Sequence, residues 1–122
     1  MIVAALAFAT QAATPAPCLR DGDVVEGEFR YVEAGLHAGR GRAIEPFVVL
    51  NDPVCVIPSV SLDPPVVRGR WIQLGQPIGQ DRPWPAPGAV IRVVVQDCHE
   101  PMTNWHIGDI FCDARLVSRV TQ

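Results

Sequence analysis

The sequence predicts an all-β fold: a small barrel of about five to six strands, stapled by disulfides. Three observations favour it. Runs of β-branched residues recur along the chain, the clearest being Val90 to Val95. Twelve prolines and ten glycines leave little room for long helices. Four cysteines, an even number, are typical of a disulfide framework in an exported chain.

Length and composition bound the class of protein. A chain of 122 residues is one domain by the usual size prior. Its hydrophobic fraction of 48% is ordinary for a globular protein and argues against disorder. The net charge of -3 argues against a general binder of nucleic acids or anionic membranes.

The first residues, Met1 to Ala13, are apolar and uncharged. They are too short to span a bilayer, which takes about 20 residues, and they match the apolar core of a signal peptide. Small residues at Ala7 and Ala9, and at Thr10 and Ala12, predict cleavage between Thr10 and Thr14. No basic residue precedes this segment, so a buried N-terminal strand or helix is the alternative. We expect residues 1–13 to be a signal peptide, residues 18–122 to form the barrel, and the protein to be periplasmic or secreted.

The four cysteines are Cys18, Cys55, Cys98 and Cys112, and they allow three pairings. Cys98 and Cys112 are close in sequence, one hairpin apart. A Cys18–Cys55 bridge would tie the N-terminal end of the domain to the middle of the sheet. The favoured pairing is therefore Cys18–Cys55 with Cys98–Cys112.

The first half of the chain predicts two strands. In the first, Val25, Gly27, Phe29 and Tyr31 alternate with charged residues, and Gly27 predicts a bulge or a sharp bend, as a coiled barrel strand would need. The second strand covers 47–50 and ends at Asn51-Asp52-Pro53, with a short continuation over 55–57.

The second half predicts three more strands. Val66 to Leu74 is the third, with a bulge at Gly69, and the Val90–Val95 run is the fourth. Between them, 75–87 is too rich in proline for more than one helical turn. The last strand covers 110–120. Its period of two predicts one face with Leu116, Ser118 and Val120, and an opposite face with Arg115, Val117 and Arg119.

Five strands of uneven length favour an OB-like barrel. An immunoglobulin-type sandwich is the alternative, but it needs about seven strands. The "L-x-x-P-x-C" of Leu50 to Cys55 and the "I-Q-L" of Ile72 to Leu74 resemble an uncharacterised bacterial family of exported domains of unknown function. The resemblance covers Cys18 to Val120 and implies an OB-like barrel. It also implies a short helix between the third and fourth strands, where Gly79 to Pro87 departs from the family's pattern.

The candidate ligand-binding residues follow from the OB-like prediction. OB-folds bind ligands on the face of their second and third strands and on the loops beside it. Trp71 lies on the predicted third strand, where filling the core is the alternative role. Beside it we expect Arg40 and Arg42, from the glycine-rich loop 35–42, and Trp105 and His106, from the Cys98–Cys112 hairpin. The expected function is a non-catalytic binding module for a protein or a cell-envelope glycan, without a cofactor.

A metal site is the alternative function. His99, His106 and Asp109 lie between two cysteines, but their spacing matches no standard zinc signature, and oxidised cysteines cannot bind a metal. Catalysis has less support. No serine stands in a glycine-flanked elbow, no phosphate-binding loop is present, and Glu26 and Glu28 share the solvated face of a strand.

Overall fold

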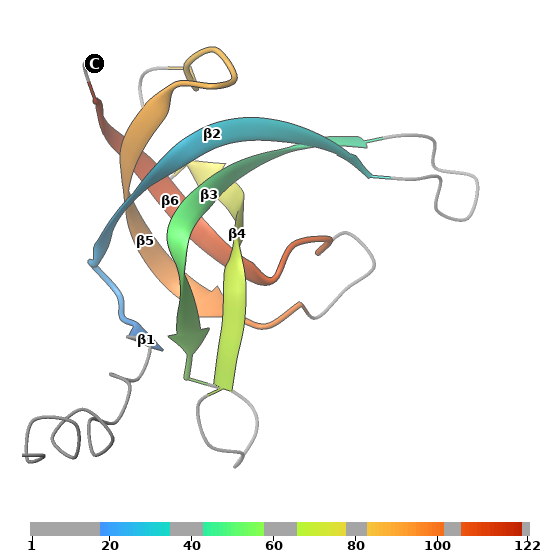
Figure 1. The fold of residues 1–122 in the computed structure, drawn as a ribbon, viewed down its shortest axis with the longest axis vertical. Coiled ribbons are helices and arrows are strands. Elements are labelled where there is room, and N and C mark those ends of the chain that lie inside the picture. The colour runs from blue at the N-terminus through green and yellow to red at the C-terminus, as the bar shows by residue number, and fades with distance from the viewer. Residues whose placement is uncertain (1–17, 35–42, 58–65, 78–82, 102–105, 121–122) are drawn as a thin grey trace, which may run out of the picture.

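The computed structural model describes residues 18–34, 43–57, 66–77, 83–101 and 106–120. These residues form six strands and no helix. The strands, labelled in Figure 1, are β1 (Cys18–Leu19), β2 (Val24–Ala34), β3 (Ala43–Val56), β4 (Val66–Pro77), β5 (Val90–His99) and β6 (Ile110–Arg119). No helix with the length and hydropathy needed to cross a bilayer occurs among the described residues.

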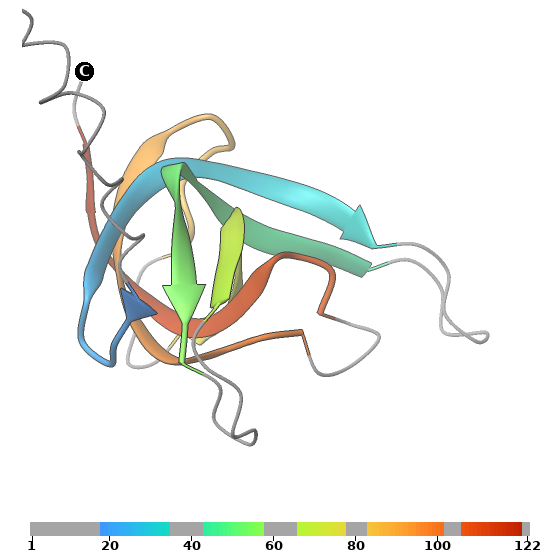
Figure 2. The same ribbon diagram turned by 60° about the horizontal axis from the view of Figure 1, so that its bottom comes forward.

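Five of the strands close into a barrel. Their order is β3-β2-β5-β6-β4, and β4 pairs again with β3 to complete the ring seen in Figure 2. All these pairings are antiparallel except that of β4 with β6. A five-stranded Greek-key barrel is the OB-fold, so the predicted fold class is confirmed.

The remaining strand, β1, lies at the edge of β3. Cys18 and Leu19 run parallel to Cys55 and Val56, and the register places Cys18 directly beside Cys55. Those two cysteines form one disulfide, with Cα atoms 4.3 Å apart, and Cys98 and Cys112 form the other, with Cα atoms 4.2 Å apart. Both predicted pairings are confirmed.

The core fills the inside of the barrel with alternate residues of each strand. On β5, Ile91, Val93 and Val95 are fully buried while Arg92 and Gln96 are exposed, as the sequence pattern predicted. On β2, Phe29 is fully buried and its ring stacks on that of Trp84, 5.6 Å between centroids. Trp84 thereby holds the segment before β5 over one end of the core.

Of the two options predicted for Gly27, a bulge or a sharp bend, the bulge is not formed. Gly27 pairs regularly with Leu50 on β3 and with Ile91 on β5. A Cβ atom at this position would collide with the backbone carbonyl of Val49. Glycine is therefore needed here because β2 and β3 approach closely where the barrel curves.

The second predicted strand is longer than expected. Asn51-Asp52-Pro53 does not end it, since β3 runs continuously from Ala43 to Val56. The register against β4 shifts between Val49 and Cys55, so these residues form an irregularity inside the strand. On the β4 side of this irregularity stands Gly69, with a φ of +135°, which bears out the predicted bulge at that position.

A second bulge places Cys98. Two residues of β5, Asp97 and Cys98, oppose the single residue Cys112 of β6. Asp97 has a φ of +53°, and its backbone N–H donates to the Asp21 carboxylate at 2.9 Å. The extra residue reverses the alternation of the strand. Cys98 therefore packs against the core, where it meets the buried Cys112.

A third bulge interrupts the pairing of β6 with β5. Val93 pairs with Leu116 and Arg92 with Ser118, which leaves Val117 as the extra residue of β6. Burial still follows the predicted alternation, since Leu116 is buried and Ser118 and Val120 are half-buried, whereas Arg115, Val117 and Arg119 are exposed. Arg119 pairs with Ile91 at the end of the strand.

Removing either disulfide should lower the free energy of unfolding of the barrel. The loss should be larger for Cys18–Cys55, which closes the longer loop. In the chain-entropy treatment, the 14-residue separation of Cys98 and Cys112 corresponds to about 3 kcal/mol. The 37-residue separation of Cys18 and Cys55 corresponds to about 4 kcal/mol. Urea unfolding of the two double Cys→Ser variants measures both losses. Equal stability of either variant and the wild type would contradict the expectation.

Replacing Asp97 tests the left-handed bulge. We expect Asp97→Gly to retain stability and Asp97→Val to lose about 1–2 kcal/mol, because a β-branched residue is strained at positive φ. Gln96→Val on the neighbouring, extended residue is the matched control. Equal unfolding free energies for the two Asp97 variants would show that the bulge is not populated.

Candidate functional site

The outer face of β3 and β4 is the surface that OB-folds use for ligands. In the paired strands, Val48 and Ile72 point into the core, whereas Phe47 and Gln73 point outward and lie outside the core cluster. The described ends of the β2–β3 hairpin and of the β5–β6 hairpin project from the same side of the barrel (Figures 1 and 2). We call this surface the β3–β4 face, defined by Arg30, Phe47, Trp71, Gln73 and residues 106–109.

Trp71 is the central aromatic group of the β3–β4 face. Its side chain is half-buried, and the edge-on ring of Phe47 lies 6.0 Å from it. The guanidinium of Arg30 lies over the indole, 5.5 Å from the ring centroid. Arg30 also forms a salt bridge with Glu28 at 3.0 Å. The indole is therefore fixed by a ring and a cation while part of it stays open to solvent.

The end of the β5–β6 connection is bonded to β4. The backbone N–H of Ile107 donates to the side-chain carbonyl of Gln73 at 2.8 Å. Asp109 makes two bonds to Trp71: its N–H donates to the Trp71 carbonyl at 3.0 Å, and its carboxylate accepts from the Trp71 N–H at 3.1 Å. Because Gln73 is only 2% exposed, its amide supplies a buried polar anchor for the connection.

Close packing accompanies these bonds. A Cβ atom on Gly108 would collide with the Phe47 ring, so Gly108 lies directly on it. Phe47 is consequently only 1% exposed although it points out of the barrel. One half of the β3–β4 face is thus covered by the chain itself, and Trp71 lies at the border of the covered half.

His99, His106 and Phe111 form an aromatic stack next to this contact. The rings of His106 and Phe111 are 4.1 Å apart, and the two histidine rings are 5.3 Å apart. Partial burial lowers the pKa of His106, the nearby His99 lowers it further, and Glu45 opposes both effects. His106 is accordingly neutral at pH 7 and acts there as an aromatic packing group.

The candidate metal ligands are only partly brought together. His99 and His106 contact each other, whereas the Asp109 carboxylate is bonded to the backbone of Trp71 and packs against Gly69. Within the described ranges, no three His, Cys, Asp or Glu side chains are arranged to hold a metal ion. The metal site stays a prediction of the sequence.

The structure places two of the five predicted ligand-binding residues on the same face. Trp71 lies at its centre, and His106 directly precedes Ile107, which is bonded to Gln73. Arg40, Arg42 and Trp105 lie outside the described residues, as does the predicted signal peptide at 1–13.

Sequence reasoning missed three members of the β3–β4 face. Arg30 and Phe47 looked like ordinary strand residues, because only the register of β2 with β3 brings them together. Gln73 did carry a signal, because it is an amide between two core residues, Ile72 and Leu74. Both faces of β4 are buried at this point, and Gln73 lies on the outer one.

Replacing Gln73 should release the connection from β4. In Gln73→Leu the partly buried N–H of Ile107 loses its acceptor, which should cost about 1 kcal/mol. Hydrogen exchange of the Ile107 amide should accelerate more than that of core amides such as Val93. Gln96→Leu, on an exposed glutamine of β5, is the control and should change neither quantity. Unchanged exchange at Ile107 would contradict the anchoring role.

No model of a known protein family, no curated protein and no solved structure matches this chain. Membership of the exported bacterial family therefore stays a prediction from the motifs. The assignment to an OB-like barrel rests on the strand pairing alone.

Proposed function

We propose that this chain is an exported, non-catalytic binding module that holds a protein or a cell-envelope glycan on the β3–β4 face. The observation that carries the proposal is the half-exposed Trp71, fixed between Phe47 and Arg30 on the surface where OB-folds bind ligands. Tryptophan and arginine are the side chains most enriched among interface hot spots. A fixed indole also loses little conformational entropy when a ligand covers it.

Charge supports a ligand that is not a polyanion. The Arg30 charge is offset by Glu28 on the same strand, and Glu45 lies near His106. A nucleic acid or a strongly anionic membrane would need a surplus of cations, which the net charge of -3 does not favour.

Export is supported by the disulfides. Two bridges in a domain of this size are typical of proteins that fold in an oxidising compartment such as the periplasm or the extracellular space. The apolar segment Met1 to Ala13 and the resemblance to an exported family point the same way.

Trp71→Ala is the direct test of the β3–β4 face. The probes are purified peptidoglycan, in a sedimentation assay, and envelope proteins, captured by cross-linking and quantified by mass spectrometry. We expect the variant to bind its partner about thirtyfold or more weakly, because removal of a central tryptophan costs about 2 kcal/mol or more. Tyr31→Ala, which removes an exposed ring from the opposite side of β2, should bind as the wild type does. Equal binding by wild type and Trp71→Ala, or an equal loss in Tyr31→Ala, would overturn the proposal.

A further inference from the structure

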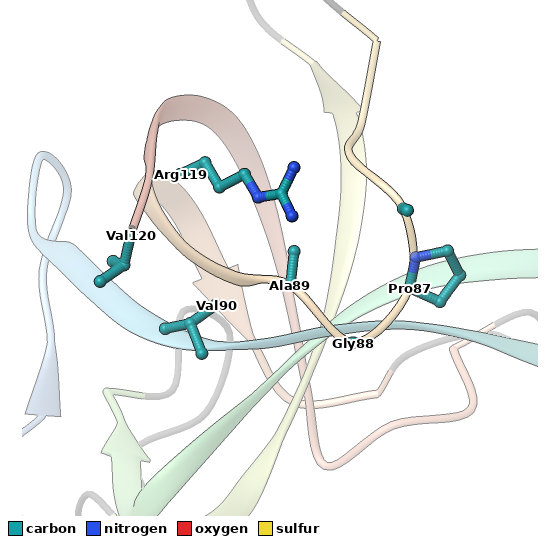
Figure 3. Close-up of a pocket in the computed structure, with 7 residues that line it drawn as sticks. Pro87, Gly88, Ala89, Val90, Arg119 and Val120 are labelled. Atoms are coloured by element: carbon teal, nitrogen blue, oxygen red, sulfur yellow. The ribbon is translucent and has the colours of Figure 1, made fainter. Parts of the chain in front are cut away.

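An open pocket of about 630 Å³ lies at the surface, at the end of the barrel where β5 begins and β6 ends, and Arg119 and residues 86–88 of its wall are exposed. Residues 86–90 line one side of it, and Arg119 and Val120 line the other. Figure 3 shows the Arg119 side chain reaching from β6 toward Ala89, with the Pro87–Gly88 turn beyond. This volume is in the range of cavities that hold small molecules. The cavity shares no residue with the β3–β4 face.

Arg119 lies at the end of β6, beyond the bulge at Val117, where the register pairs it with Ile91. Its side chain is exposed to solvent and extends along the pocket wall toward Ala89 (Figure 3). The guanidinium is therefore accessible to a ligand that enters the pocket.

The Arg119 charge is not neutralised by neighbouring carboxylates. Arg30 and Arg92 form salt bridges with Glu28 and Glu26 at 3.0 and 2.8 Å. No such bridge is made by Arg119 to any described residue, and no acidic side chain lines the cavity. The Arg119 guanidinium therefore forms no ion pair with any described carboxylate.

Three backbone N–H groups of the cavity wall are already bonded. The N–H of Gly88 donates to the Phe29 carbonyl, and the N–H of Val120 donates to the Val90 carbonyl, both at 2.8 Å. The N–H of Ala89 donates to the Ala86 carbonyl and closes the turn. The remaining surface is that of alanine, proline and valine side chains. The wall therefore offers one strong cationic donor beside small apolar groups.

We propose that this cavity binds an organic carboxylate with a short apolar body, its two oxygens held by the Arg119 guanidinium. The planar fork of arginine matches a carboxylate with two parallel N–H···O bonds. Ala89, Pro87 and Val120 then contact the carbon chain. A short fatty acid and the C-terminal residue of a peptide both present this chemistry. The site is independent of the proposed function, because it lies on other strands.

Titration with both kinds of carboxylate tests the site. The probes are sodium hexanoate and acetyl-Ala-Ala, each compared with its own amide, and the readout is the backbone amide shifts of the intact protein. We expect saturable shifts at Gly88, Ala89 and Val120 with the carboxylates and none with the amides. Saturation by hexanoate alone identifies a fatty-acid site, and tighter binding of the peptide identifies a C-terminus site.

Variants of β6 make the test specific. Arg119→Gln should lower the affinity for the carboxylate by roughly tenfold to a hundredfold, since hydrogen bonds to charged groups are the strong ones. Arg119→Lys should recover part of the affinity because it keeps the charge without the fork. Arg115→Gln, on an exposed arginine of the same strand, is the control and should bind as the wild type does. Absence of saturation in the wild type, equal binding by Arg119→Gln, or shifts centred on residues outside 86–90 and 118–120 would overturn the proposal.

Discussion

The parallel pairing of β4 with β6 is the interaction on which the rest of this structure depends. Residues 71–73 of β4 pair with β3 on one side and residues 72–74 pair with β6 on the other, so this short stretch closes the sheet. Without it the five strands would form an open sheet with two exposed edges and a core uncovered on one face. Ile72 and Leu74 are buried inside the closed barrel, whereas Gln73 points outward and is buried beside the end of the β5–β6 connection.

The β3–β4 face follows from that closure. A parallel pair cannot be joined by a tight turn, so the chain must reach β6 by way of the β5–β6 connection. The last residues of this connection lie beside β4, where Ile107 is hydrogen-bonded to the Gln73 side chain and Asp109 to the Trp71 backbone. The barrel thereby covers half of its own outer face and leaves Trp71 at the border. A cross-strand contact between Phe47 and Gly108 completes the arrangement.

Much of the fold could be predicted from residue patterns, because strands, proline breaks and cysteine spacing are local features. The positions of the bulges in β5 and β6, and the side of β5 on which Cys98 lies, could not be predicted. Asp97 and Val117 each add one residue to a strand, and the sequence offers no glycine at either place to signal it. The insertion at Asp97 decides that Cys98 meets Cys112. The β3–β4 face was predicted in outline through Trp71, while Gln73 and Phe47 emerged only from the register.

The Cys18–Cys55 bridge has a mechanical consequence. By itself β1 is a two-residue strand, and a pull on the chain ahead of it would peel it from β3 with little resistance. The covalent link transmits such a load directly to β3, which is paired on both sides within the ring. The load would then be shared by the backbone hydrogen bonds that join β3 to β2 and β4.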